Sequence, residues 1–534
     1  MHKNPLPRAT RTSISTKASG VAYRNGSLAM MLALVAASVV ALALRLPSPL
    51  EPVANGIMDR TPVIIAIPLL LRLGPLAQPL ALCGAAALAL LVGGLLGRLW
   101  GAPSPTVRER RAGPSIPRVG IEGPVSHGWG GEGILRAGVA AAILAGGAAL
   151  LAPRGDIVVA AVVVAVYVLA LYALNRRAAV AGPVEGRRLF LLHNARIVAG
   201  FAALIALLYL QPVAHLLRTR AAGRALFPWT PPRPRKPGFD VAGLTPEVTP
   251  VGAFYQIDED IQQPDIALDG WTLSIEGLVR RPTRLSFADL LALPRHDEWV
   301  TQRCVSNPVD GQWMSTALFS GATIPTLLAR AGGSLPAASA VLFRSSDGHE
   351  EAIPLALALD GIVMLAYAMD GRLLEQAHGF PARGLIPGYY GYKSVKWVTE
   401  LHVTTDSRQG FWEQRGWVPL PAVQTIARID VARRDARGLL VAGVAFAGRR
   451  GVRAVQVRVG DGPWHAAALH TPALSPLTWA QWRVTLPPGA FPARGSLTVQ
   501  ARAVDGRGKI QTAAARDQYP SGATGYDSRI VDSR

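Results

Sequence analysis

Residues 378–397 read HGFPARGLIPGYYGYKSVKW. Glycines in this stretch let backbone N–H groups approach a ligand closely. Arg383, Lys393 and Lys396 add cations, and two of the chain's six lysines stand three residues apart here. This composition predicts a loop that binds a phosphorylated ligand. On these residues alone, the alternative is a basic loop in contact with solvent.

Cys304 is the second feature on which the function depends. It lies in WVTQRCVSNP, residues 299–308, where a strand is expected to run into a polar loop. The chain has 2 cysteines, and the other, Cys83, lies in a long apolar run. No Cys or His is spaced for a zinc site with Cys304. Three interpretations stay open: a small buried hydrophobe, a nucleophile, or a ligand for a soft metal.

Apolar residues are concentrated before about residue 215. The 534 residues are 50% hydrophobic, and their mean hydropathy of +0.26 is high for a water-soluble protein. The formal net charge is +20, and a basic chain is a candidate for nucleic-acid binding. Many of the cations flank apolar segments, however, as they do in membrane proteins. No nucleic acid is therefore expected as a partner.

Five apolar runs predict an N-terminal α-helical transmembrane bundle, at residues 28–44, 79–96, 134–151, 157–174 and 189–210. Each is close to the length that crosses a bilayer, about 20 residues. Lys and Arg concentrate in the N-terminal tail and in alternate loops, which predicts a cytoplasmic N-terminus. The expected location is therefore the cell membrane, as a multi-pass protein in contact with lipid. Its later domains would lie on the extracytoplasmic side.

The last apolar run begins near GRRLFL, residues 186–191, which resembles a twin-arginine export signal. The alternative is two more cytoplasmic cations. His193 and His215 would lie about 33 Å apart on one helix, so they cannot hold one haem between them. No haem is predicted, and residues 1–215 are expected to be a membrane anchor.

The remaining sequence predicts a linker and two domains. Residues 216–240 are rich in proline and arginine and should form an extended linker. Residues 241–421 mix short strands and helices, which predicts an α+β domain with a capping box at Ser286 and a helix at 324–331. Residues 422–534 contain short strands and Asp-Gly turns, which predicts an all-β immunoglobulin-like sandwich.

Residues 250–420 resemble the molybdopterin domain of the sulfite oxidase family. The matching motifs are RC at 303–304, STA at 315–317, AYAMDG at 366–371, HGFPAR at 378–383 and KSVKW at 393–397. The C-terminal region is similar to the dimerisation domain of the same family, which implies a possible homodimer. The resemblance implies that the central domain has the molybdopterin-binding fold.

The resemblance also implies a role for individual residues. Cys304 would bind molybdenum through its thiolate, which is a soft ligand. Tyr367 would face the metal and assist catalysis, and the alternative is that Tyr367 is a buried core aromatic. The residues expected to contact molybdenum–molybdopterin are Tyr255, Gln256, Ser345, His378, Arg383, Lys393, Ser394, Val395 and Lys396.

Two positions depart from the family pattern and bear on the substrate. Sulfite oxidases place arginines around their substrate, whereas here the early loop carries Asp258, and Val309 stands five residues after Cys304. Sulfite should therefore bind poorly. The predicted function is oxygen-atom transfer on a small-molecule substrate, with an external electron carrier, either a cytochrome or a membrane redox partner. The alternatives are a sulfoxide or other oxide reductase of the same family, and a non-catalytic surface binding module.

Overall fold

The computed structural model describes most of residues 238–532, with gaps at 259–262, 406–408 and 493–494. It also describes the helix α4 (Ala77–Gly101) and short runs of residues between 23 and 200. The chain divides into two compact units. The first is Met1–Ala214 with Asp260–Asp265, and the second is His215–Glu259 with Ile266–Arg534. All of the predicted site residues belong to the second unit.

In the first unit, the described part of α4 contributes to a small hydrophobic cluster. Ala85 and Ala86 are buried in this cluster together with Leu34 and Tyr167. The Tyr167 hydroxyl donates a hydrogen bond to the Gly93 carbonyl at 2.8 Å. Part of the apolar surface of α4 is therefore used in contacts inside this unit.

The prediction of a transmembrane bundle in a multi-pass membrane protein is wrong for this structure. Among the residues that the structure describes, no helix has both the length and the apolar character needed to span a bilayer. The prediction counted apolar residues, and a count does not separate an apolar face that packs inside a unit from one that faces lipid. The run at 134–151 and the twin-arginine-like motif at 186–191 lie outside the described residues.

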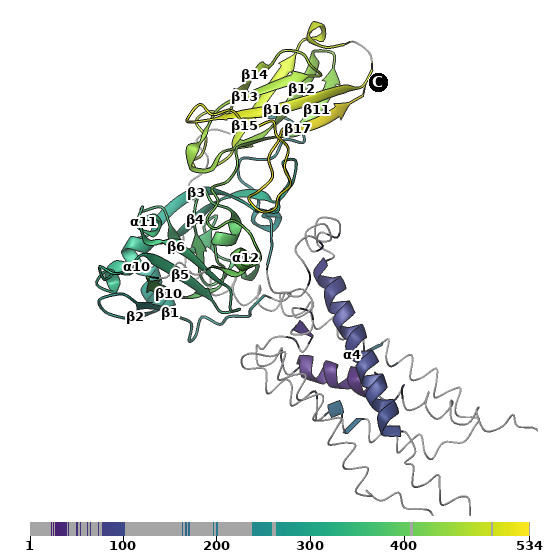
Figure 1. The fold of residues 1–534 in the computed structure, drawn as a ribbon, viewed down its shortest axis with the longest axis vertical. Coiled ribbons are helices and arrows are strands. Elements are labelled where there is room, and N and C mark those ends of the chain that lie inside the picture. Colours follow the sequence, from purple (N-terminus) through teal and green to yellow (C-terminus); the bar gives the residue numbers. More distant parts are fainter. Residues whose placement is uncertain are drawn as a thin grey trace, which may run out of the picture. The chain divides into compact units, whose positions relative to one another are not determined.

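Two sheets build the central part of the second unit (Figure 1). The first has the strand order β2-β1-β10-β5-β6, and the second has the order β3-β4-β7-β8, with β9 paired to β7. β1 and β10 are parallel, whereas β3 and β4 are antiparallel. The strands are β1 (Thr272–Gly277), β2 (Thr283–Ser286), β3 (His296–Arg303), β4 (Met314–Thr323), β5 (Ala340–Ser345), β6 (Glu350–Pro354), β7 (Met364–Met369), β8 (Arg372–Leu373), β9 (Arg383–Leu385) and β10 (Val398–Thr404).

Short helices connect these strands: α9 (Phe287–Leu291), α10 (Ile324–Arg330), α11 (Leu355–Ala358) and α12 (Phe411–Gln414). α9 begins with the predicted capping box, in which the Ser286 hydroxyl accepts from the Asp289 N–H and the Asp289 carboxylate accepts from the Ser286 N–H at 2.9 Å. The predicted α+β class overstates the helix content. In the described part of 238–532 the longest α-helix is α10, with 7 residues, so the central domain is β-rich.

One hydrophobic core is shared by the two central sheets. Leu273 of β1 and Phe343 of β5 come from the first sheet, and Val300 of β3 and Phe319 of β4 come from the second. All four side chains are fully buried. The last four side chains of β3, which lie on both faces of the strand, are buried. This packing fixes the position of the strand that leads directly into Cys304.

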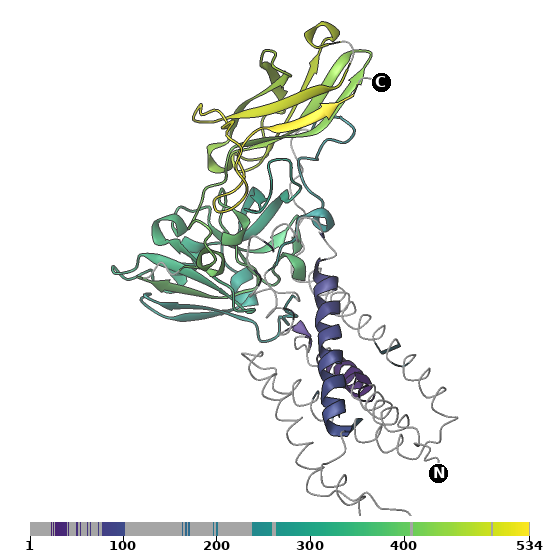
Figure 2. The same cartoon turned by 45° about the vertical axis from the view of Figure 1, so that its right-hand side comes forward.

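The C-terminal strands form one connected sheet with the order β11-β12-β15-β14-β13-β16-β17. Figure 2 shows these strands in the light-green to yellow part of the ribbon. The predicted immunoglobulin-like sandwich of two separate sheets is therefore wrong. The short strand β14 pairs with β13 on one side and with β15 on the other, which joins the two halves. β11 also contacts β16 and β17, so the sheet closes like a barrel. The strands are β11 (Ile426–Asp435), β12 (Gly438–Phe446), β13 (Val452–Val459), β14 (His465–Leu469), β15 (Ala480–Leu486), β16 (Leu497–Asp505) and β17 (Asp527–Val531).

The loop before β15 is bonded to β3. The Thr301 N–H donates to the Leu477 carbonyl at 3.0 Å, and the Trp479 N–H donates to the Thr301 hydroxyl at 2.9 Å. The Ser475 hydroxyl donates to the Glu298 carboxylate at 2.8 Å. The C-terminal sheet thus supports the strand that carries Cys304.

Candidate functional site

Cys304 is the first residue after β3 and is buried. Its N–H donates to the Trp313 carbonyl at 3.0 Å, and its carbonyl accepts from the Asn307 N–H at 3.2 Å. Burial raises the pKa of Cys304 to about 11, although hydrogen bonds from Ser306 and the charge of Arg303 act in the opposite direction. The described residues contain no group of three or more His, Cys, Asp or Glu side chains arranged to hold a metal ion.

Arg303, the neighbour of Cys304, is a fully buried cation. Its guanidinium donates to the carbonyls of Asn307 at 3.2 Å and Gln424 at 3.4 Å. It also lies over the Tyr390 ring, 5.7 Å from the ring centroid. These partners are neutral, so they orient the charge of Arg303 without neutralising it.

Arg383 begins β9 and is the second buried cation of the site. It donates to the Gln302 amide oxygen at 2.9 Å and to the carbonyls of His378 at 3.2 Å and Ser394 at 3.4 Å. Burial lowers the pKa of Arg383 to about 10, so the group still carries its charge at neutral pH.

The surroundings of Arg303 and Arg383 fit an anionic group. Within the described residues neither guanidinium forms an ion pair, and the Nε atom of each is buried without a hydrogen-bond partner. A buried charge needs a partner of opposite sign to offset its desolvation. The anion that the sequence predicts is the thiolate-ligated molybdenum–molybdopterin with its phosphate, and the residues present suit it.

Tyr255 and Gln256 belong to the early loop, as predicted. The Tyr255 N–H donates to the Ser315 hydroxyl at 3.1 Å. A Cβ atom at Gly391 would clash with the Tyr255 hydroxyl and lie 3.5 Å from the Arg303 carbonyl, so glycine is needed there. The Tyr255 hydroxyl therefore lies close to the residue that precedes Cys304. Burial and the charge of Cys304 raise the pKa of Tyr255, whereas Gln256 is exposed.

Lys396 lies beneath the same loop. Its ammonium pairs with the Asp258 carboxylate and donates to the carbonyls of Ala377 at 2.8 Å and Ile257 at 3.4 Å. Burial lowers the pKa of Lys396, and Asp258 acts against that shift. The structure thus brings Lys396 to the early loop, with Asp258 as its counter-ion.

His378 and Ser345 are both buried near this region. His378 Nε2 lies 3.1 Å from the Val251 carbonyl, which can only accept, so Nε2 carries the proton of the neutral ring. Burial lowers the pKa of His378 to about 4, helped by the charges of Lys396 and Arg383. The Ser345 hydroxyl donates to the Trp397 carbonyl at 3.4 Å.

Ser394 and Val395 support the main chain next to Arg383. The Ser394 hydroxyl accepts from the Ile386 N–H at 3.2 Å, and the Val395 carbonyl accepts from the Gly384 N–H at 2.8 Å. Both residues are buried. They are placed to hold Arg383 and the backbone of the predicted cofactor loop in one arrangement.

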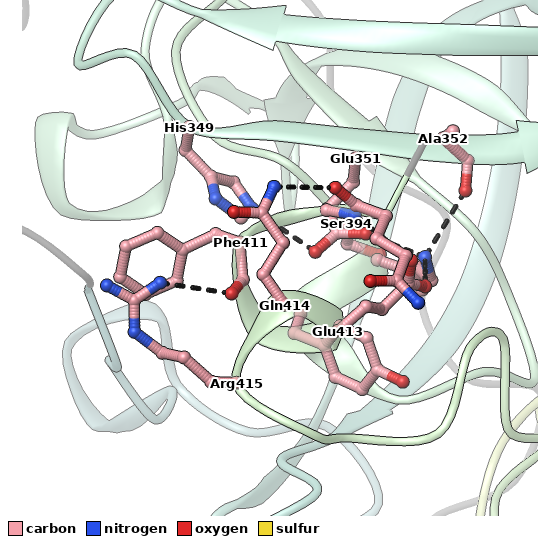
Figure 3. A network of polar contacts seen from close by, with 12 residues as sticks. His349, Glu351, Ala352, Ser394, Phe411, Glu413, Gln414 and Arg415 are labelled. Atoms are coloured by element: carbon pink, nitrogen blue, oxygen red, sulfur yellow. Dashed lines mark hydrogen bonds and ion pairs between the residues drawn. The ribbon is translucent and has the colours of Figure 1, made fainter. Parts of the chain in front are cut away.

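Lys393 does not face this site. Its ammonium donates to the Glu351 carboxylate at 2.6 Å and to the Ala352 carbonyl at 3.2 Å, and it pairs with Glu413 (Figure 3). Lys393, Glu351 and Glu413 are all buried. The structure therefore separates Lys393 from Arg383 and Lys396, although the sequence grouped the three.

Tyr367 is the second predicted residue that the structure does not bring to Cys304. It lies on β7 at the register shift between Ala368, which pairs with Ser320 of β4, and Ala366, which pairs with Gly321. The β3–β4 pairing next to Cys304 ends at Met314. Six strand residues correspond to about 20 Å along the sheet. The Tyr367 ring packs edge-on against Phe287 at 6.5 Å in the hydrophobic core. Burial raises the pKa of Tyr367 to about 12.

The structure adds Gln302, Arg303 and Tyr390 to the site. All three are buried although two are strongly polar. The sequence signal for Gln302 and Arg303 is that two consecutive polar residues end a strand that is otherwise buried. Buried polar side chains are usually hydrogen-bonded or paired, so such a pair indicates a ligand or a partner at this position. Tyr390 is one of three tyrosines in YYGY, residues 389–392, and no local sequence pattern singles it out from the other two.

Comparison with known proteins identifies similar chains. A family model described as "Oxidoreductase molybdopterin binding domain" matches residues 260–412. The chain is 33% identical over 149 residues to "Uncharacterized oxidoreductase YuiH" of Bacillus subtilis, covering 28% of this chain and 72% of that protein. It is 28% identical over 312 residues to "Sulfite oxidase, mitochondrial" of Rattus norvegicus, covering 49% of this chain and 57% of that protein.

Two further similar proteins are a curated protein and a solved structure. The chain is 30% identical over 168 residues to "Putative protein-methionine-sulfoxide reductase subunit YedZ1" of Azospira oryzae, covering 32% of this chain and 61% of that one. Among solved structures, the sulfane dehydrogenase SoxCD from Paracoccus pantotrophus is similar, with a TM-score of 0.48 and 22% identity over 54% of this chain and 82% of that chain. The chain thus spans about six tenths of the length of two of these relatives.

Proposed function

Because the chain belongs to the sulfite oxidase family of molybdopterin-dependent oxidoreductases, we propose that it transfers an oxygen atom to or from a small substrate beside Cys304. The observation that carries this proposal is the pair of buried cations, Arg303 and Arg383, next to a buried thiol. A redox reaction also needs an electron carrier as partner. A homodimer formed through β11–β17 is part of the proposal.

The residues have separate tasks in this proposal. When bound, molybdenum–molybdopterin supplies the two-electron chemistry of oxygen-atom transfer, which side chains lack. Cys304 ligates the metal, and Arg383, Ser394, Val395 and Lys396 hold the pterin and its phosphate. His378 offers its unprotonated Nδ1 as an acceptor, since Nε2 is used by Val251. Gln256 and Ser345 complete the predicted contacts.

Tyr255 takes the role that the sequence gave to Tyr367. Its hydroxyl lies against Gly391 and near the Arg303 carbonyl, whereas Tyr367 lies in the packed core. The charge of Cys304 acts on the pKa of Tyr255. We therefore assign to Tyr255 the hydroxyl that orients the substrate or donates a proton to it.

A second candidate function is reduction of a sulfoxide or a similar neutral oxide. Asp258 is a buried carboxylate in the early loop, where it pairs with Lys396. That pairing offsets part of the positive charge of Lys396, and the Asp258 carboxylate itself repels a sulfite dianion. A neutral oxide avoids this disadvantage.

The test measures turnover of the chain purified from a host that makes molybdenum–molybdopterin. Sulfite oxidation would be followed with ferricyanide, and sulfoxide reduction with reduced viologen. We expect activity with at least one substrate, and at least a hundredfold loss in Cys304→Ser, because thiolate ligation is removed. Equal turnover in the wild type and in Cys304→Ser would contradict the proposal.

A further inference from the structure

Lys393 joins three segments that are distant in the sequence. Glu351 and Ala352 belong to β6, Glu413 belongs to α12, and Lys393 ends the short 3-10 helix η4 (Gly391–Lys393). Figure 3 labels Glu351, Ala352 and Glu413 in this network of polar contacts, and the bonds from Lys393 bring the three residues together. The two carboxylates are separated from Lys393 by 42 and 20 residues in the chain. The cluster is therefore a tertiary junction.

The hydrogen-bonding capacity of Lys393 is filled at this junction. An ammonium group has three N–H donors. One goes to Glu351 at 2.6 Å, one to the Ala352 carbonyl at 3.2 Å, and one to Glu413. If Lys393 turned to a phosphate, two buried carboxylates would lose their cation, whereas Lys396 has a single carboxylate partner, Asp258, and one carbonyl contact as long as 3.4 Å.

The backbone of Lys393 leads directly into the cofactor loop. The Lys393 N–H donates to the Tyr390 carbonyl at 3.1 Å, and the Ser394 N–H donates to the Gly391 carbonyl at 2.9 Å. Ser394 in turn accepts from Arg383 through its carbonyl at 3.4 Å. A displacement of the Lys393 backbone would therefore move Ser394, and with it the carbonyl that accepts from the guanidinium of Arg383.

We propose that Glu351 and Glu413 are positioning residues, which fix Lys393 and thereby hold residues 391–396 in the shape that binds molybdopterin. This inference rests on the proposed function. It assigns Lys393 to the support of the site and leaves Lys396 and Arg383 as the cations that contact the cofactor. Direct binding of phosphate by Lys393 is the competing arrangement, and the two predict opposite effects of removing the carboxylates.

The experiment measures pterin retained per chain after gel filtration, by fluorescence of its oxidised form. The full-length chain is produced in a host that makes the cofactor, as wild type, Glu413→Gln, Lys393→Met, and the triple variant Lys393→Met/Glu351→Gln/Glu413→Gln. Circular dichroism melting of each cofactor-free protein separates loss of fold from loss of cofactor. The matched control is Lys396→Met with Lys396→Met/Asp258→Asn, since Lys396 is assigned to direct contact.

We expect Lys393→Met to lower retained pterin by about tenfold, because two buried carboxylates lose their cation. The triple variant should recover to within about threefold of the wild type, because no unpaired charge is left in it. In the control pair, removal of Asp258 should give no recovery. A triple variant as poor as Lys393→Met would overturn the inference.

If Lys393→Met does not fold, Glu413→Gln distinguishes the positioning role of Lys393 from direct binding of the phosphate. The positioning role predicts lower pterin retention, because Lys393 loses one of its anchors. Higher retention would overturn the inference, because it would mean that the freed ammonium binds the phosphate. A wild-type chain that holds no pterin would overturn the proposed function and this inference with it.

Discussion

At the scale of single residues, two cations and a thiol, Arg303, Arg383 and Cys304, are buried in the same site. Arg303 and Arg383 are held by carbonyl and amide oxygens, not by carboxylates. Burial raises the pKa of Cys304 to about 11, so without a bound partner the thiol stays protonated at neutral pH. In the proposed function, the anionic cofactor would offset both arginine charges, and its metal would stabilise the thiolate.

The two tyrosines give a direct test at this scale. Tyr255→Phe should lower kcat by about ten- to a hundredfold, because it removes the hydroxyl near the Arg303 carbonyl, one residue before Cys304. Tyr367→Phe is the matched control and should change kcat by less than about twofold, because that hydroxyl lies in the core. Steady-state kinetics with the substrate found in the turnover test measures both. A larger loss in Tyr367→Phe would return the role to Tyr367.

Glu351 provides a prediction about pH. Burial raises its pKa from 4.5 to about 7, although Lys393 and His349 lower it and Glu413 raises it. Between these two pKa values the folded chain binds the proton more tightly than the unfolded chain. The contribution of this carboxyl to stability is therefore complete below pH 4.5 and is lost as the pH rises through about 7. Tyr392 also faces the cluster and stays neutral in this range, because burial raises its pKa.

The expected result is that Glu351→Gln weakens the pH dependence of folding stability. Urea unfolding of the cofactor-free protein at several pH values would show a smaller fall between pH 4.5 and 7 in the variant than in the wild type. Glu350→Gln is the control, since Glu350 pairs with Arg344 on the accessible side of the same strand. Identical pH profiles for Glu351→Gln and the wild type would contradict the assignment.

At the scale of elements, the loop before β15 is expected to stabilise β3. Trp479 is buried, and its ring N–H donates to the Glu247 carbonyl at 3.0 Å while its backbone binds Thr301. Trp479→Ala should cost about 3–5 kcal/mol of unfolding free energy, because it leaves a large cavity. Hydrogen exchange should show β3 amides losing protection. Trp464→Ala, at a half-buried site in the turn between β13 and β14, should leave β3 protection unchanged. Equal loss of β3 protection in both variants would contradict this coupling.

Local elements were the part of the fold that the sequence predicted well. The Ser286 capping box and the helix near 324–331 depend on residues within one or two turns, and both are present. The sandwich prediction failed because β14 pairs on both sides, with β13 and with β15. Such pairing depends on contacts between distant strands, which alternation in a single strand does not specify.

The site shows the same division between local and distant information. The motif around 378–397 led to Arg383 and Lys396, which the structure places near the early loop and Cys304. It also led to Lys393, whose two carboxylate partners lie on β6 and α12. Tyr367 matched a motif, but the pairing of β4 with β7 sets its distance from Cys304. Sequence motifs identified the neighbourhood, and tertiary pairing decided which residues face it.

At the scale of the whole molecule, the central sheets and the C-terminal sheet belong to one compact unit. Thr301 and Glu298 of β3 are bonded to the loop before β15, and Arg428 of β11 donates to the Gly311 carbonyl at 3.0 Å, a few residues after Cys304. The C-terminal sheet therefore contributes to the rigidity of the site. Among the described residues, these hydrogen bonds reach β3 and the loop after Cys304, and none of them is made to the Cys304 side chain.

The central claim is that Cys304 anchors molybdenum–molybdopterin in this chain. It is tested most directly by metal analysis, pterin analysis and electron paramagnetic resonance on full-length protein from a host that makes the cofactor. The account predicts about one molybdenum and one pterin per chain, with a resonance signal that changes in Cys304→Ser while the pterin is retained. A folded protein that lacks molybdenum, or a signal that is the same in Cys304→Ser, would contradict it.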